Sequence, residues 1–323
     1  MKKITALLLC ALLTLSALVL VSCGAKEENL KLGLGVYSTA EATNADSEKN
    51  GSGNVVITAA IVLVDKDGKI VKCVLDTADH TVAYTSAGKA VAETEFKTKH
   101  ELGEAYGMKG APYGSDKEWY EHANAFCAAV EGKTVSEVKA FVAADGKNTD
   151  AIISAGCTIA ASDFVKAVEK AVANAKDSAA TKSTTLKLGV STTQETADAT
   201  ADKAGSNALT TDIFAAAVDA EGKIVAATNE TVVADFTFDA TGKSSFNAGN
   251  KDLFASKREL GDAYGMKTPE GTPYGSRKEW YEHADAFVAA CIGKKASDIT
   301  ASFTAAGCTI TVDGFVAAVA KIG

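Results

Sequence analysis

The stretch that decides the fold runs from Asn54 to Asp76 and reads NVVITAAIVLVDKDGKIVKCVLD. Two runs rich in valine and isoleucine flank the pair Asp67-Gly68, and an Asp-Gly pair in that setting is a strong signal for a β-hairpin. A second hairpin is predicted by VDAEGKIV from Val218, where Glu221-Gly222 takes the place of Asp67-Gly68. The sequence therefore predicts two antiparallel sheets, one around each hairpin.

The repetition extends over most of the chain. LGEAYGMK from Leu102 returns as LGDAYGMK from Leu260, and PYGSDKEWYEHANAF from Pro112 returns as PYGSRKEWYEHADAF from Pro273. The sequence separation between the two copies of each motif is far above the repeat length of a solenoid, which indicates a tandem duplication. We predict one domain over 30–175, a polar linker over 176–184 and a second domain over 185–323.

Helices are predicted behind each sheet. From Asp116 to Val130 the apolar residues recur at helical spacing, and a second apolar face runs from Phe164 to Val172. Strands followed by helices favour the α+β class, here as two tandem copies of a sheet covered by helices.

The first residues predict export. Lys2 and Lys3 precede an apolar run that ends in Leu20-Val21-Ser22-Cys23, which has the form of a lipobox. We expect residues 1–22 to be a lipoprotein signal peptide, Cys23 to carry the lipid and residues 23–29 to be a tether. The protein would then be extracytoplasmic and anchored in the lipid bilayer. An uncleaved transmembrane anchor is the alternative, and LSALVLVS before Cys23 also resembles a released pheromone peptide.

Charge and cysteine content exclude some classes of protein. The formal net charge is -8 and the sequence pI is about 5.2, which argues against nucleic acid as a partner. Beyond Cys10 and Cys23, an odd number of cysteines remains, which is not the pattern of a disulfide framework. Glu118 and His122 are spaced for one helix face, but the sequence supplies no third metal ligand.

Ala-Gly-Cys-Thr-Ile is written twice, in SAGCTIAAS from Ser154 and in TAAGCTITV from Thr304. Small residues leave the threonine hydroxyl uncrowded, and Ser162 is expected to cap the helix that follows. The free amides and dipole of a helix N-terminus suit a phosphate. Cys157 and Cys308 are expected to be small apolar fillers, with a redox thiol as the alternative.

These motifs resemble the FMN-binding domain family, whose members carry FMN on the threonine of a Ser-Gly-Ala-Thr-like motif, and the flavin lipoproteins of extracellular electron transfer. The resemblance implies FMN in phosphoester linkage to Thr158 and Thr309, attached by an FAD-dependent flavin transferase. It also implies a membrane quinol or dehydrogenase as electron donor and external acceptors such as ferric iron. Gly156, Cys157, Gly307 and Cys308 would complete the two attachment motifs.

Aromatic residues and methionines in the repeated motifs are candidates for contacts with the flavin ring. They are Tyr106, Met108, Tyr113, Trp119 and Tyr120 in the first copy and Tyr264, Met266, Tyr274, Trp280 and Tyr281 in the second. Aromatic residues at helical spacing are equally typical of a hydrophobic core, and that alternative stays open for Trp119 and Trp280.

The expected function is that of a lipid-anchored electron carrier rather than a substrate-specific enzyme, because no nucleophile and base pair is evident. The rival is a non-redox ligand-binding or adhesive surface lipoprotein. His122 and His283 are expected to be hydrogen-bonded at the surface or against the flavin. The charged segments KTKHELGE and ASKRELGD are interpreted as solvated helix starts without chemistry.

Overall fold

The computed structural model describes residues 27–110, 112, 114–268 and 276–323. The predicted signal peptide, Cys23, Tyr113 and Tyr274 lie outside the described residues. Within this part of the chain, no helix combines the length and the apolar character needed to cross a membrane.

The first half forms a five-stranded antiparallel sheet with the order β4-β3-β2-β1-β5, and helices follow it. Its elements are β1 (Lys31–Thr43), β2 (Gly51–Val64), β3 (Ile70–Tyr84), β4 (Ala90–Val91), α2 (Lys99–Leu102), η1 (Gly103–Tyr106), α3 (Trp119–Val130), α4 (Val135–Lys139), α5 (Asp150–Ser154), α6 (Ser162–Ala173) and β5 (Lys176–Asp177).

The second half repeats this order with a three-stranded sheet, β6-β7-β8. Its elements are β6 (Thr185–Ala197), β7 (Gly205–Val218), β8 (Ile224–Phe238), η2 (Lys251–Leu253), α7 (Lys257–Leu260), η3 (Gly261–Tyr264), α8 (Trp280–Cys291), η4 (Ala296–Asp298) and α9 (Asp313–Ala320). The α+β class is confirmed.

The predicted hairpin joins β2 to β3. The amide of Gly68 donates to the carbonyl oxygen of Asp65 at 3.1 Å, and Gly68 has a φ of 75° that favours glycine. The amides of Asp67 and Lys69 donate to the carboxylate of Asp65. The same turn joins β7 to β8, with the Gly222 amide donating to Asp219.

The two sheets pack face to face and share one hydrophobic core. Alternate residues of β1, β2 and β3 meet those of β6, β7 and β8 in this layer. Tyr84 and Phe238, the last residues of β3 and β8, stack with ring centroids 4.4 Å apart and an interplanar angle of 8°. The halves are therefore related by an approximate twofold arrangement rather than joined end to end.

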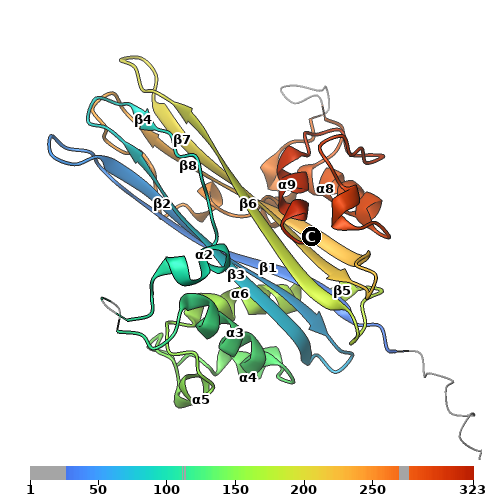
Figure 1. The fold of residues 1–323 in the computed structure, drawn as a ribbon. Coiled ribbons are helices and arrows are strands. Elements are labelled where there is room, and N and C mark those ends of the chain that lie inside the picture. Colours follow the sequence, from blue (N-terminus) through green and yellow to red (C-terminus); the bar gives the residue numbers. More distant parts are fainter. Residues whose placement is uncertain (1–26, 111, 113, 269–275) are drawn as a thin grey trace, which may run out of the picture.

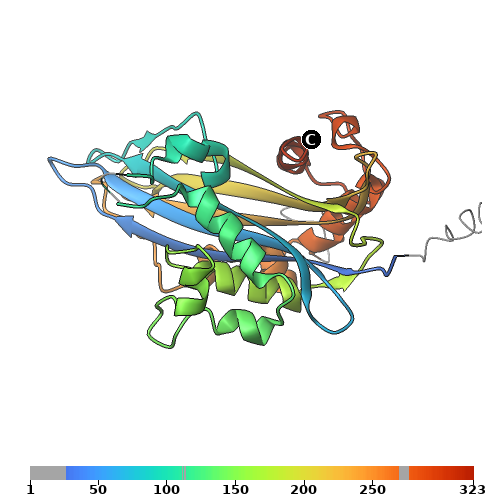
Figure 2. The same cartoon turned by 60° about the horizontal axis from the view of Figure 1, so that its bottom comes forward.

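Helices cover the outer face of each sheet, so the molecule has the layer order helices, sheet, sheet, helices (Figures 1 and 2). The helix α6 lies directly on β1, because Gly35 has no side chain: a Cβ there would come within 2.1 Å of the Ala167 carbonyl oxygen. Gly189 of β6 admits α9 in the same way, with 2.0 Å to the Ala318 oxygen. The repeated LGV sequence thus sets the distance between sheet and helix.

The segment predicted as a linker lies against the first sheet. Lys176–Asp177 pairs with the start of β1, and the Ala180 carbonyl oxygen accepts from the Leu30 amide at 2.8 Å. The domain boundaries themselves stay a prediction.

Candidate functional site

The repeated Ala-Gly-Cys-Thr motif forms a turn between the helices at the back of each half. Gly156 has a φ of 103° and its counterpart Gly307 a φ of 85°, a conformation that favours glycine. Thr158 and Thr309 follow two residues later, and both side chains are exposed. The threonine hydroxyl is therefore accessible in both copies.

A lysine ammonium group lies against this turn. Lys117 Nζ donates to the Gly156 carbonyl oxygen at 2.9 Å. A Cβ at Gly156 would lie 2.8 Å from the same Nζ, so any larger residue would displace the lysine. Lys278 Nζ contacts the Gly307 oxygen at 2.9 Å in the second copy.

A buried histidine connects the turn to the neighbouring loop. Ser115 Oγ donates to the Lys117 carbonyl at 2.7 Å and accepts the Lys117 amide, so it accepts from His122 Nε2 at 3.0 Å. His122 Nδ1 lies 3.3 Å from the Thr158 amide nitrogen and 3.2 Å from the Gly156 carbonyl oxygen, and the tautomer decides whether it accepts from the amide or donates to the carbonyl. His122 thus fixes the backbone beside the threonine.

The second copy repeats these contacts. His283 Nε2 lies 2.9 Å from Ser276 Oγ, and the Thr309 amide donates to His283 Nδ1 at 3.3 Å. Burial lowers the pKa of His283, which favours the neutral ring. The prediction of hydrogen-bonded histidines is confirmed, but a surface position is wrong, because His122 is fully buried and His283 is 2% exposed.

Glu118 and His122 bind different segments of the backbone. Its two carboxylate oxygens accept the amides of Met108 and Lys109 at 2.9 and 3.1 Å. Glu279 accepts the amides of Met266 and Lys267 in the same way. Among the described residues, no group of three or more histidine, cysteine, aspartate or glutamate side chains is placed to share a metal ion.

The motif cysteines differ in exposure. Cys157 is fully buried in the core under α3 and α6, and burial raises its pKa to about 11. Cys308 is half-buried, and burial raises its pKa as well. A thiol with a raised pKa is a weak nucleophile near neutral pH, which favours the packing role.

The candidate ring contacts divide into two groups. Trp119 and Trp280 are 3% and 2% exposed and lie edge-on to Phe164 and Phe315 of the core. By contrast, Tyr106 is half-buried, and Lys99 Nζ lies 5.0 Å from its ring centroid. The remaining candidates, Met108, Tyr120, Tyr264 and Tyr281, are half-buried, whereas Met266 is buried.

The prediction for Ser162 is wrong. Ser162 does not cap α6: the helix begins at Ser162, and Ala161 precedes it without a side-chain cap. The Ala161 amide is instead held by Asn148 Oδ1 at 3.0 Å.

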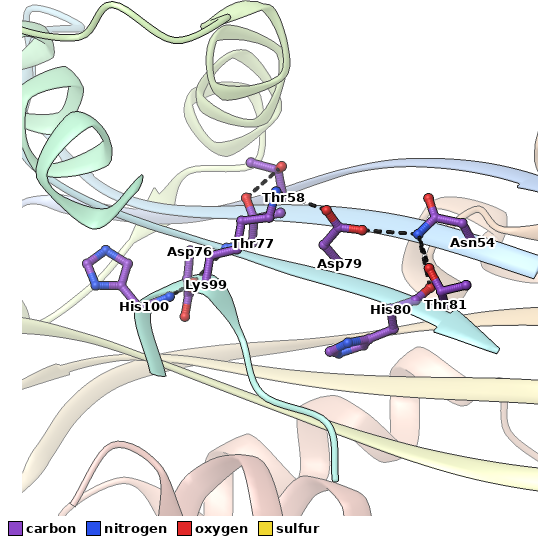
Figure 3. Close-up of polar contacts among 9 residues, drawn as sticks. All are labelled: Asn54, Thr58, Asp76, Thr77, Asp79, His80, Thr81, Lys99 and His100. Atoms are coloured by element: carbon purple, nitrogen blue, oxygen red, sulfur yellow. Dashed lines mark hydrogen bonds and ion pairs between the residues drawn. The ribbon is translucent and has the colours of Figure 1, made fainter. Parts of the chain in front are cut away.

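The charged segment KTKHELGE, which contains α2, is not merely solvated. Lys99 forms an ion pair with Asp79 at 3.0 Å, with its side chain only 13% exposed (Figure 3). Asn54 Nδ2 donates to the other carboxylate oxygen of Asp79 at 3.1 Å. This segment therefore contributes a structured charge cluster on the outer side of β3.

The sequence interpretation missed Ser115 and Lys117 with their counterparts Ser276 and Lys278. All four lie in the repeated PYGSxKEWYEHA motif, three and five positions after its proline. Their preservation in both copies was the available signal. In comparisons with known proteins, no family model, no curated protein and no solved structure matches this chain.

Proposed function

We propose that Thr158 and Thr309 are attachment sites for FMN and that the protein is an electron carrier at the outer face of a membrane. The observation that carries the proposal is the exposed threonine, which in both copies follows a glycine turn held by a lysine ammonium group. The turn, the lysine contact and the exposed threonine are present in both halves.

The residues around the hydroxyl fit a phosphoester. The ammonium of Lys117 can shift from the Gly156 oxygen to a phosphate oxygen and balance its charge. His122 lies against the Thr158 amide, and the Thr158 side chain is exposed, so a transferase can reach it. The helix α6 begins at Ser162, four residues after Thr158, and a helix N-terminus favours an anion close to it.

For the ring, the indoles of Trp119 and Trp280 are enclosed in the core. The half-buried candidates are the available contacts: Tyr106, Met108 and Tyr120 in the first copy and Tyr264 and Tyr281 in the second. FMN supplies reversible uptake and release of electrons when bound. Covalent attachment keeps the site occupied where free FMN is dilute. Two sites on one chain allow transfer between a membrane donor and an external acceptor.

A ligand-binding surface lipoprotein is the second candidate function. A cavity between the two sheets, lined by charged and apolar side chains, favours it.

The function is tested on protein exported from cells that contain an active FAD-dependent flavin transferase. We expect a flavin absorption spectrum that dithionite bleaches and a ferric complex restores. The double variant Thr158→Ala/Thr309→Ala should lack it, whereas Ser154→Ala/Thr304→Ala, which removes exposed hydroxyls near the same turns, should keep it. The proposal would be contradicted if the wild-type protein showed no flavin absorption although the transferase in the same cells modified another target.

A further inference from the structure

Two buried cysteines lie on neighbouring elements in the outer core of the first half. Cys73 is on β3 and Cys127 is on α3, and both belong to the hydrophobic core between this sheet and its helices. Each residue is 7% exposed, and both are free thiols. Figure 2 shows α3 lying across the outer face of the first sheet, where it contacts β3.

The two thiol groups are in direct contact. Cys73 and Cys127 share a side-chain hydrogen bond, which together with burial raises the pKa of Cys73. This hydrogen bond already brings the two sulfur atoms together, and a disulfide bond would close the contact to about 2.05 Å. The thiol of Cys157, in the same core, donates instead to the Ile159 carbonyl oxygen at 3.8 Å. The contact between thiols is therefore specific to one pair.

The second half replaces both cysteines. Cys73 is the fourth residue of β3, and the fourth residue of β8 is Ala227. Cys127 is the ninth residue of α3, and the ninth residue of α8 is Val288. Ala227 and Val288 pack against the corresponding core. The fold therefore packs these two positions without sulfur, and the cysteines occur together or not at all.

We propose that Cys73 and Cys127 form a disulfide bond that fastens α3 to β3 in the first half only. The proposal rests on the predicted export of the protein, because disulfides persist in oxidising compartments, and it does not depend on FMN attachment. The bond leaves Cys157, Cys291 and Cys308 as free thiols. A single bond agrees with a cysteine content that does not form a disulfide framework.

The oxidant is a second disulfide, carried by a protein or by oxidised glutathione. One cysteine thiolate attacks that disulfide, which forms a mixed disulfide and releases the first thiol of the oxidant. The other cysteine then attacks the mixed disulfide, forms the bond between Cys73 and Cys127 and releases the second thiol. The two cysteines lose two electrons and two protons, and the two thiols of the reduced oxidant gain them.

Burial determines when this exchange can take place. The thiolate is the attacking species, and the raised pKa of Cys73 makes it scarce in the folded protein. With 7% of each residue exposed, a disulfide reagent also has little access. We expect the bond to form while the chain folds, before α3 packs on β3, and the folded protein then to shield it from reductants.

The bond would fix a helix that contacts the threonine turn. α3 carries His122, whose Nδ1 lies 3.2 Å from the Gly156 carbonyl oxygen. A disulfide from Cys127 to β3 would hold this helix against the sheet. The equivalent helix of the second half, α8, has no cysteine at the position of Cys127 and is held by packing alone.

The test is refolding of the reduced, urea-unfolded protein in a glutathione buffer poised like an oxidising compartment. The remaining thiols are then alkylated in urea, and the protein is digested with trypsin. Lysines separate Cys73, Cys127 and Cys157, so each lies on its own peptide. We expect the peptides of Cys73 and Cys127 to be linked, lighter than their sum by two hydrogen atoms, and the peptide of Cys157 to be alkylated.

The controls copy the second half. Cys73→Ala and Cys127→Val introduce the residues that stand at the equivalent positions, and both should fold with the wild-type circular dichroism spectrum. In each variant the remaining cysteine of the pair should be alkylated. Cys157→Ala should still form the linked peptides. The proposal is overturned if both cysteines of the pair are alkylated or carry glutathione in the wild type, or if Cys127 is linked mainly to Cys157.

Discussion

The ammonium group of Lys321 lies 2.7 Å from the Oε1 of Glu101, so the end of the second half is paired with α2 of the first. Lys170 of α6 forms the equivalent ion pair with Glu259 of α7. Each half thus contacts the other with the same pair of elements, as in an isologous dimer interface. Together with the shared core between the sheets, these contacts predict that the halves unfold together.

Single-tryptophan variants test this cooperativity. Trp119 and Trp280 lie in the outer cores of the first and second halves, and the chain has no other tryptophan. In Trp119→Phe and in Trp280→Phe, the remaining tryptophan should report the same urea midpoint as far-UV circular dichroism. Two separated transitions would mean that the halves unfold independently.

Glu230 is predicted to reduce stability at neutral pH. Burial raises its pKa to about 7, so the folded state holds a proton that the unfolded chain releases above about 4.5. Stability is therefore lost as the pH rises from 4.5 to 7. We expect Glu230→Gln to be more stable than the wild type at pH 8, on the order of 3 kcal/mol, and similar at pH 4.5. A stability difference independent of pH would refute this assignment.

His80 is predicted to act in the opposite pH direction. Burial lowers its pKa to about 4, so below pH 6.5 the unfolded state binds a proton that the folded state excludes. Wild-type stability should fall relative to His80→Gln between pH 6.5 and 4, on the order of 3 kcal/mol. Urea unfolding of both proteins at these two pH values measures the effect, and parallel curves would contradict it.

Gly314 and Asp212 are predicted to be coupled. A Cβ at Gly314 would lie 1.9 Å from Asp212 Oδ2, whereas the first half has Asp163 on the helix and Thr58 on the strand at these positions. Gly314→Ala should therefore cost about 1–3 kcal/mol of stability in the wild type. With Asp212→Thr already present, the same change should cost nothing measurable. An equal cost in both backgrounds would show that the two positions do not interact.

Local patterns predicted the elements of this fold but not the way they pair. The Asp67-Gly68 turn and the apolar spacing of Trp119 and Phe126 each report a contact within one half, and both the hairpin and α3 are confirmed. The stacking of Tyr84 on Phe238 depends on residues far apart in sequence, so periodicity cannot show it. α3 also begins at Trp119 rather than Asp116.

The candidate site was only partly predictable for the same reason. Thr158 and Gly156 stand together in the sequence, and their turn follows from the glycine. Lys117 and His122 reach this turn from a distant loop and helix, and only the fold brings them to the Gly156 carbonyl.

The central claim is that Thr158 and Thr309 each carry one FMN. The most direct measurement is the intact mass of the protein exported with an active flavin transferase, beside the single variants Thr158→Ala and Thr309→Ala. The account predicts two FMN adducts on the wild type and one on each variant. An unmodified wild-type mass, with the transferase shown to modify another target in the same cells, would contradict it.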